Sequence, residues 1–296
     1  MVRPPRVFGR RGRRVRPPRL RGLTVNKLLP NVLTLLALAS GMTAMRFGLE
    51  GRFEPAVIAI VVAAVFDALD GRIARLLNAQ SKFGEELDSL SDVVSFGVAP
   101  AMILYVWVLK DAGTFGWIAA VLLGICAALR LARFNTALGM AVEKPAWAYN
   151  YFTGVPAPAG AGLAILPLIA TLELGTGIFD HSWLVVPWVV AIAALMVSAL
   201  PTFSLKGLRI PPRYVVFVLI GVAAISAGLV SAPWATLTVI GIAYLGSLPL
   251  SVKHYERLRD EAERLSATPA DAGSGAAPAG SPVATEAAAE DGAARS

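Results

Sequence analysis

Four aspartates are the residues of this sequence whose spacing most directly suggests chemistry. Asp67 and Asp70 are three positions apart, and Asp88 and Asp92 are four positions apart, next to long apolar stretches. On a helix, these spacings place each pair on one face, about 60° and about 40° apart around the axis. A charged side chain at bilayer depth is costly and is a functional hypothesis by default. The four carboxylates are therefore the primary candidate site.

A divalent cation is the simplest counter-charge for this group. A short connection between the two helices would bring both pairs together, and four carboxylates around one point cannot all stay ionised alone. Ligation by oxygen suits Mg²⁺ or Mn²⁺, so the sequence predicts one or two such ions. Zinc is not expected, because His181 and His254 are distant in the sequence and Cys126 has no cysteine partner. A buried network of acids and arginines remains the structural alternative.

Small residues accompany the acids. Gly71 and Ala74 share the helix face of the first aspartate pair, and Gly84 lies one turn before Asp88. Such residues let a ligand or another backbone approach closely. Arg75 follows directly and carries a planar donor group suited to phosphate. This combination favours a phosphate-containing ligand beside the carboxylates.

The elements that position these residues must be apolar helices. The chain has 296 residues, of which 56% are hydrophobic and 16% are charged, with a mean hydropathy of +0.63. Soluble globular proteins are usually about 45–50% apolar and about 25% charged, so that class is excluded. The single cysteine also excludes an intramolecular disulfide. The composition is that of a polytopic membrane protein.

The net charge of +7 does not indicate a nucleic-acid-binding protein. Residues 1–27 hold nine arginines and Lys27 with no acid, which leaves 17 basic and 20 acidic residues for the rest of the chain. The positive charge therefore belongs to a tail that is attracted to anionic lipid headgroups or simply sets the orientation in the membrane.

Eight segments are long and apolar enough to be expected to span a bilayer, which needs about 20 residues. The predicted fold class is thus an all-α polytopic membrane protein with about eight transmembrane helices. Seven spans remain open, because only Ser231 to Trp234 separate the last two segments. The expected spans are residues 28–47, 54–77, 88–109, 115–137, 157–176, 183–202, 213–231 and 234–252.

The basic residues predict the orientation of these spans. With eight spans and the N-terminus inside, 24 lysines and arginines fall on the cytoplasmic side, and Arg46, Arg52 and Lys110 fall outside. This asymmetry predicts that both termini and the aspartates face the cytoplasm. The first apolar segment is too long for a cleaved signal peptide and is expected to be a span.

Four regions are expected along the chain. Residues 1–23 should form a basic, disordered cytosolic tail, and residues 24–252 the transmembrane catalytic domain. Residues 253–265 should continue as a helix in the cytosol. Residues 266–296 are rich in Ala, Gly, Pro, Ser and Thr and are expected to be disordered.

Residues 67–92 read DALDGRIARLLNAQSKFGEELDSLSD, or D-x2-D-G-x2-A-R-x8-G-x3-D-x3-D. This pattern resembles the signature of the CDP-alcohol phosphotransferases, membrane enzymes that move a phosphoalcohol from a CDP carrier to an acceptor hydroxyl. Eight fixed residues at fixed spacing make a specific signal. The resemblance implies the fold of that family and membership of an integral-membrane enzyme class.

The flanking segments resemble the branch of the family that accepts serine, the CDP-diacylglycerol–serine O-phosphatidyltransferases. They are SFGVAPA at Ser95, LRLARFN at Leu129, FTGVPAPAGAG at Phe152 and PTFSLK at Pro201. The resemblance covers residues 24–252. It implies CDP-diacylglycerol and L-serine as substrates, phosphatidylserine and CMP as products, and a homodimer; whether the donor lipid is a diacyl ester or an archaeal ether stays open.

The same resemblance implies roles for individual residues. Asp67, Asp70, Asp88 and Asp92 would hold the metals, with Asp92 as the general base and Asp88 shared between roles. The CDP and diphosphate group would lie against Gly71, Ala74, Arg75 and Gly84. Pro30, Asn31 and Thr34 of the first span match residues that contribute to the nucleotide pocket in the family.

The sequence signal for the residues that bind the acceptor is less specific than the signal for the aspartate motif. The carboxylate of serine needs a cation, and Lys82, Arg130 and Arg133 are the basic residues near the cluster, while Ser95 and Asn135 offer hydrogen bonds. Positive-inside anchoring explains the same basic residues equally well.

Two other functions remain open at this stage. A sister enzyme of the family would use glycerol 3-phosphate or an inositol phosphate as acceptor, which should require a denser basic pocket. A cation or proton transporter would also use intramembrane acids. Transporters often have repeated halves, however, and residues 150–252 contain no matching acidic pair.

Overall fold

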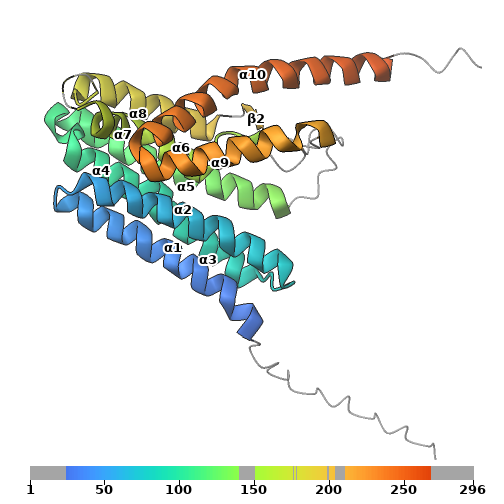
Figure 1. Ribbon diagram of the computed structural model, residues 1–296, viewed down its shortest axis with the longest axis horizontal. Helices are drawn as coiled ribbons and strands as arrows, with labels where there is room; N and C mark the ends of the chain where they lie inside the picture. The colour runs from blue at the N-terminus through green and yellow to red at the C-terminus, as the bar shows by residue number, and fades with distance from the viewer. Residues whose placement is uncertain are drawn as a thin grey trace, which may run out of the picture. The chain divides into compact units, whose positions relative to one another are not determined.

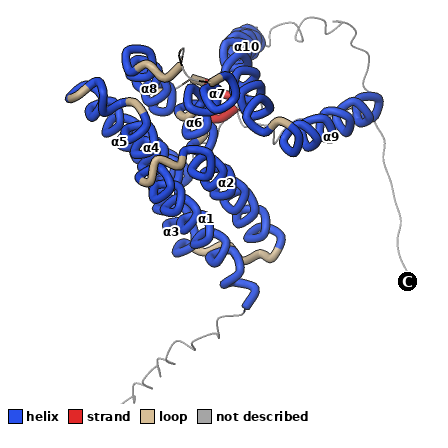
Figure 2. Tube along the Cα trace, turned by 60° about the vertical axis from the view of Figure 1, so that its left-hand side comes forward, coloured by secondary structure: helices blue, strands red, loops and turns tan. Residues whose placement is uncertain are grey.

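The computed structural model describes residues 25–139, 151–175, 177, 179–198, 200–203 and 211–267. The expected tails, residues 1–23 and most of 266–296, lie outside these residues. The described chain is helical apart from two three-residue strands (Figures 1 and 2). The α-helices are α1 Val25–Leu49, α2 Phe53–Leu76, α3 Lys82–Asp92, α4 Ala99–Trp107, α5 Thr114–Gly139, α6 Ala157–Ala164, α7 Leu166–Leu174, α8 Ser182–Val197, α9 Val215–Ser231 and α10 Pro233–Ala267.

Short helices and strands complete the structure. Val93–Val98 (η1) is a π-helix, and Leu109–Ala112 (η2) and Pro212–Tyr214 (η5) are 3₁₀ helices. The strands β1 (Tyr151–Thr153) and β2 (Pro201–Phe203) pair antiparallel, with Phe152 opposite Thr202. They join the chain just before α6 to the chain just after α8.

The chain divides into two compact units, Met1–Lys253 and His254–Ser296. The first contains all the candidate site residues. The described part of the second is the final segment of α10, from His254 to Ala267. The helix expected over residues 253–265 is therefore present as the end of α10.

Helix α1 is the element against which the other site-bearing helices pack. It contacts α2 along much of its length and also contacts α3, η1 and α4 (Figure 1). The residues that face these neighbours are small, and Ala37 and Ala44 are fully or almost fully buried. Small side chains let helix backbones approach closely, which is how apolar helices pack in membranes.

Two serines fix α3 and η1 to α1 through backbone carbonyls. Ser91 Oγ donates to the carbonyl of Thr34 at 3.2 Å, and Ser95 Oγ donates to the carbonyl of Ala37 at 3.2 Å. Gly41 lies at the next contact along α1, where an added Cβ would be 2.5 Å from Ser95 Oγ. These contacts set the position of α3, and hence of its aspartates, relative to α1.

The π-helix η1 follows Asp92 directly and is tightly enclosed. Ser95, Phe96 and Gly97 are buried, and a Cβ on Gly97 would be 2.8 Å from Ala127 Cβ on α5. Short π-helical segments within α-helices occur frequently at functional sites. Here the π-helix joins α3 directly to α4. The span expected at 88–109 is therefore a continuous helical segment whose pitch changes at η1.

The apolar core lies beyond the site, between α2, α4, α5, α7 and α8. Its largest fully buried side chains include Leu104, Leu123, Leu168 and Ile192. Trp188 Nε1 donates to the carbonyl of Leu163 at 2.9 Å, which ties α8 to α6. Ala44 near the end of α1 also belongs to this core, so the core joins α1 to the helices behind the site.

Helices lie within each of the eight expected spans, but α8 ends at Val197, so Pro201 and Thr202 of the span expected at 183–202 belong to β2 instead. By length and apolar composition, four segments of the described chain can cross a membrane: Leu28–Leu49, Lys82–Trp107, Thr114–Thr136 and Pro233–Arg257. The pair α6 and α7, bent by 43°, is a fifth if it counts as one span. Helices α8 and α9 are shorter, and α2 is long but contains several charged residues. The chain is therefore a helical membrane protein with four or five such spans.

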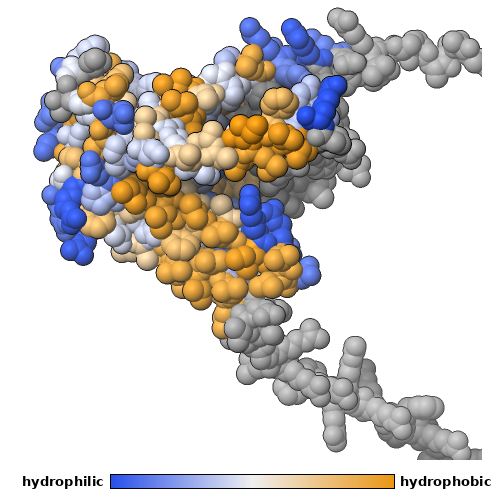
Figure 3. All heavy atoms as spheres, viewed as in Figure 1, coloured by the Kyte–Doolittle hydropathy of each residue, from blue (hydrophilic) through white to orange (hydrophobic). Residues whose placement is uncertain are grey.

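Large apolar side chains cover the outside of these helices (Figure 3). On α1 and α2 they include Leu35, Met42, Ile58 and Val65, all about half exposed. Helix α9 buries none of its residues, although its sequence is almost entirely apolar. Such continuous exposed apolar surface marks contact with a membrane or a partner.

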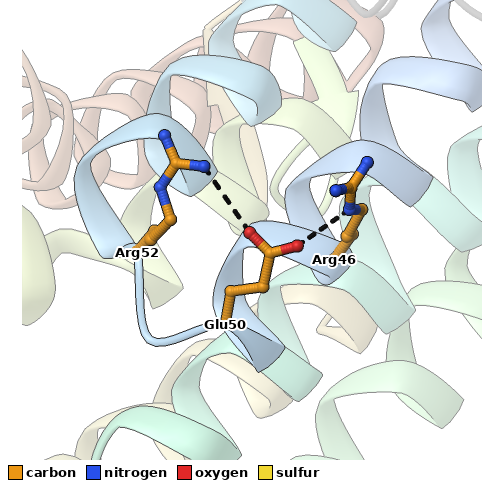
Figure 4. Close-up of polar contacts among 3 residues, drawn as sticks. All are labelled: Arg46, Glu50 and Arg52. Atoms are coloured by element: carbon orange, nitrogen blue, oxygen red, sulfur yellow. Dashed lines mark hydrogen bonds and ion pairs between the residues drawn. The ribbon is translucent and has the colours of Figure 1, made fainter.

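The turn between α1 and α2 holds a small ion-pair cluster (Figure 4). Glu50 lies between Arg46, at 2.8 Å, and Arg52, at 3.5 Å. All three side chains are solvent-accessible, so the pairs contribute about 1 kcal/mol or less each. Glu50 thus pairs with two of the three basic residues expected on the outer side of the membrane and offsets one of their two positive charges.

Candidate functional site

The connection from α2 to α3 brings the two aspartate pairs together. Helix α2 ends at Leu76, and Asn78 adopts a left-handed backbone conformation with φ of 49°, which asparagine tolerates well. The N–H of Ala79 then returns to the carbonyl of Ala74 at 2.9 Å. Ser81 caps α3 by accepting a hydrogen bond from the N–H of Gly84 at 3.1 Å. The tight turn places the end of α2 beside the start of α3.

Three carboxylates converge at this junction. Asp67, Asp70 and Asp88 each offer one oxygen, and these oxygens lie within 4.8 Å of one another. Asp70 is 5% exposed, while the other two are half-buried. The carboxyl of Asp92 is also half-buried and lies near those of Asp67 and Asp88. The sequence spacing alone predicted this convergence.

Thr34 connects the cluster to α1. Its hydroxyl donates to Oδ2 of Asp70 at 2.7 Å and lies 3.1 Å from the carbonyl of Pro30. Its own carbonyl accepts the hydrogen bond from Ser91 on α3. One residue of α1 therefore bonds to both aspartate-bearing helices, and it holds the carboxylate of Asp70 in a fixed orientation.

The cluster has the donor set for a divalent cation. Among the described residues, no arginine or lysine forms an ion pair with any of these four aspartates. Oxygen ligands of Mg²⁺ at about 2.1 Å are at most about 4.2 Å apart, so small side-chain movements would bring the three oxygens around one ion. The geometry thus fits a metal ion bound by Asp67, Asp70 and Asp88.

A pocket of about 320 Å³ opens beside the cluster. It is formed by α1, α2, α3, the turn between α2 and α3, and one residue of α5. Its size suits a small polar ligand. Its lining residues are Pro30, Asn31, Thr34, Asp70, Gly71, Ala74, Arg75, Ala79, Gln80, Ser81, Gly84, Glu85, Asp88 and Phe134.

The small residues predicted to make room for a ligand lie in this wall. A Cβ on Gly71 would meet no atom within 4 Å, so the glycine leaves open space in the pocket. A Cβ on Gly84 would be 3.0 Å from Oδ1 of Asn31 and 3.2 Å from Oγ of Ser81. Gly84 thus allows the close approach of α3 to α1.

The residues expected to bind the acceptor are not gathered in one place. Ser95 is buried and bonded to α1, and Arg133 is exposed and donates from its NH1 to the carbonyl of Val197 at 2.9 Å. Asn135 Nδ2 donates to Ser89 Oγ at 2.9 Å. Lys82 is exposed at the start of α3. Arg130 differs, because it is half-buried and lies within electrostatic range of Asp92.

Sequence reasoning missed several residues of the pocket. Gln80 and Ser81 lie in the turn between α2 and α3, and only the three-dimensional path of the chain brings them to the pocket. Phe134 comes from α5, more than 40 positions after Asp88. Phe134 belongs to the segment LRLARFN, which the sequence had already indicated. Within that segment, however, functional roles were predicted only for the polar residues.

The fold and the site together define a class of protein. The chain is a helical membrane protein with an acidic cluster on α2 and α3. A pocket with polar residues in its lining opens beside that cluster.

The chain belongs to the CDP-alcohol phosphatidyltransferase family. The model of that family matches residues 27–200, and a second model, CDP-alcohol phosphatidyltransferase 2, matches residues 213–249. The first match includes every residue that lines the pocket and all four aspartates. The resemblance inferred from residues 67–92 is therefore confirmed.

Relatives in other organisms carry more specific names. The chain is 39% identical over 248 residues to a CDP-diacylglycerol–serine O-phosphatidyltransferase of Mycobacterium tuberculosis, covering 84% of this chain and 86% of the relative. It is 35% identical over 193 residues to an enzyme of the same name from Helicobacter pylori, covering 65% and 79%. An archaetidylserine synthase of Methanothermobacter thermautotrophicus is 37% identical over 138 residues, covering 45% and 54%.

The bond from Thr34 to Asp70 should tune metal affinity. In Thr34→Val, the carboxylate loses its fixed donor, and we expect Mn²⁺ affinity to fall about tenfold or more, as for other partners of metal ligands. The measurement is a titration of purified protein with Mn²⁺, followed by the electron paramagnetic resonance of the free ion. Thr43→Val is the matched control, because Thr43 bonds only within its own helix, to Ala39, and is exposed. Equal affinities in the two variants would contradict the role of Thr34.

Proposed function

We propose that this protein is a CDP-diacylglycerol–serine O-phosphatidyltransferase, which makes phosphatidylserine and CMP from CDP-diacylglycerol and L-serine. The observation that carries the proposal is the convergence of Asp67, Asp70 and Asp88 beside a polar pocket lined by Gly71 and Arg75. The names of the relatives from M. tuberculosis and H. pylori support serine as the acceptor.

The pocket has a surface for each part of the nucleotide. Gly71 and Ala74 leave room for the cytidine, and Asn31, Thr34 and Gly84 line the same pocket. Arg75 supplies a planar donor for the diphosphate. Asp67, Asp70 and Asp88, with Asp92 alongside, would hold one or two divalent cations. When bound, Mg²⁺ or Mn²⁺ withdraws charge from the diphosphate and makes CMP a better leaving group.

The residues allow a direct displacement. Asp92 accepts the proton of the serine hydroxyl as the hydroxyl oxygen attacks the phosphorus that carries diacylglycerol. The new bond joins that oxygen to phosphorus, and the bond from phosphorus to the bridging oxygen breaks, so CMP leaves with the electron pair. A carboxylate is a weak base for an alcohol, so positioning and electrostatics supply most of the rate.

The membrane arrangement of the proposal has eight spans, with both termini and the site on the cytoplasmic side. It is supported by the distribution of lysine and arginine and by the apolar helices of the described chain. Residues 24–252 would form the catalytic domain, with cytosolic tails on both sides. The donor's acyl chains would stay in the bilayer while its diphosphate reaches the aspartates at the interface. A homodimer is part of the proposal, and the exposed apolar face of α9 is available for lipid or a second copy.

The acceptor can be tested directly. Membranes containing the protein are incubated with CDP-diacylglycerol, Mg²⁺ or Mn²⁺, and one labelled acceptor at a time: L-serine, glycerol 3-phosphate or an inositol phosphate. We expect a labelled lipid and CMP only with serine. Membranes from the same cells without the protein are the control. A product from glycerol 3-phosphate but not from serine would assign the chain to a sister activity, and no CMP with any acceptor would favour the transporter.

The general base can be tested by substitution. Asp92→Asn removes the proton acceptor but keeps the size of the side chain, and we expect turnover to fall about a hundredfold or more, within the range for general-base loss. Binding of the CDP-lipid should largely persist, measured with radiolabelled lipid on purified protein. Asp111→Asn is the control, because Asp111 is exposed in η2, remote in sequence from the site. Retained turnover with lost lipid binding would refute the assignment of Asp92.

A further inference from the structure

Two buried polar atoms in the described part of the chain have no hydrogen-bond partner. They are Nε of Arg130 on α5 and the hydroxyl of Tyr244 on α10. Both atoms are shielded from solvent, and native proteins rarely leave such groups unpaired. An unpaired buried donor in a membrane enzyme indicates a ligand group that completes it.

The two residues belong to one local group. Arg130 interacts electrostatically with Tyr244 and with Asp92, although they come from α5, α10 and α3. Arg130 has no ion-pair partner within 4 Å among the described residues. The guanidinium is therefore within electrostatic range of both the proposed base and a phenol, and its Nε has no hydrogen-bond partner.

From this arrangement, we propose that Arg130 and Tyr244 form the subsite that binds the carboxylate of the amino-acid acceptor. The inference rests on the proposed function and adds Tyr244, a residue of α10, to the site. Both groups are hydrogen-bond donors, and a carboxylate offers two oxygens that can accept from them. Arg–carboxylate contacts of this kind are strong and geometrically specific.

The position of the pair suits serine in particular. Only two carbon atoms separate the hydroxyl of serine from its carboxylate, so the carboxylate must bind close to the base that receives the hydroxyl proton. Arg130 meets that requirement through its proximity to Asp92. Arg133 and Ser95 do not offer the same, because their side chains already bond to backbone carbonyls.

Tyr244 also lines an apolar cavity. It has a volume of about 250 Å³, and its lining includes Ala64, Gly162, Leu163 and Gly241. Ala64 is one turn before Asp67 on α2, so Tyr244 lies at the border between this cavity and the acidic site. Apolar walls keep water away from the phenol and the guanidinium, which strengthens their bonds to an anion.

The experiment compares acceptors with and without a carboxylate. Purified full-length protein is assayed with CDP-diacylglycerol and Mn²⁺, with either L-serine or serinol, in which a hydroxymethyl group replaces the carboxylate. The variants are Tyr244→Phe and Arg130→Lys. The matched controls are Tyr105→Phe, a half-buried tyrosine of α4 that packs on Trp117, and Arg52→Lys in the turn after α1.

We expect both variants to raise the KM for serine about tenfold or more, the size of a lost bond to a charged group. The kcat for serine and the KM for the CDP-lipid should change less than about threefold, because the carboxylate contact is the same before and during the reaction. The preference for serine over serinol, as a ratio of kcat/KM, should fall by the same factor. The controls should match the unaltered protein.

Two results would overturn the inference. A serine KM equal to that of the controls would remove the subsite, and equal losses for serine and serinol would show a structural role only. If Tyr244→Phe no longer binds the CDP-lipid, Arg130→Lys decides with the same two acceptors. Unaltered protein that makes no phosphatidylserine would instead refute the proposed function, before any variant is compared.

Discussion

The position of Thr34 is the constraint on which the site depends. Its hydroxyl donates to Asp70 on α2 and its carbonyl accepts from Ser91 on α3, so a single residue of α1 fixes both aspartate-bearing helices. The second serine contact, from Ser95 to Ala37, and the close approach at Gly41 extend the same contact along α1. Together with the turn between α2 and α3, these bonds set the distance between the carboxylates, because apolar packing alone gives little directional control over how two helices meet.

The cluster explains why an apolar protein keeps buried acids. Four carboxylates without an ion-pair partner among the described residues are costly to bury together, and the metal and phosphate ligand proposed for the site would offset that cost. The glycines serve the same end, since Gly71 leaves the pocket open and Gly84 lets α3 approach α1. Arg130 and Tyr244 are a similar case, because in the proposed subsite their unpaired donors would bind the carboxylate of the acceptor.

The sequence was sufficient for the helices and for the acidic cluster, because both follow from local spacing. The expected apolar segments contain helices, of which four or five in the described chain are long and apolar enough to cross a membrane. Asp67, Asp70 and Asp88 converge as their helical spacing predicts. The π-helix after Asp92 and the contributions of Phe134 and Tyr244 could not be predicted. The two aromatic residues come from α5 and α10, far from the aspartates in the sequence, and an aromatic residue in an apolar span carries no signal of its partner. Ser95 and Arg133 were natural candidates for binding, yet their bonds to backbone carbonyls became visible only in three dimensions.

The most direct test of the account is the position of the metal and the donor lipid. The purified protein would be crystallised with Mn²⁺ and CDP-diacylglycerol, and anomalous diffraction would be measured at the manganese edge. We expect an anomalous peak between the carboxylates of Asp67, Asp70 and Asp88, with the lipid diphosphate beside Arg75 and the cytidine against Gly71. Absence of manganese from these aspartates, or a diphosphate bound away from them, would contradict the account.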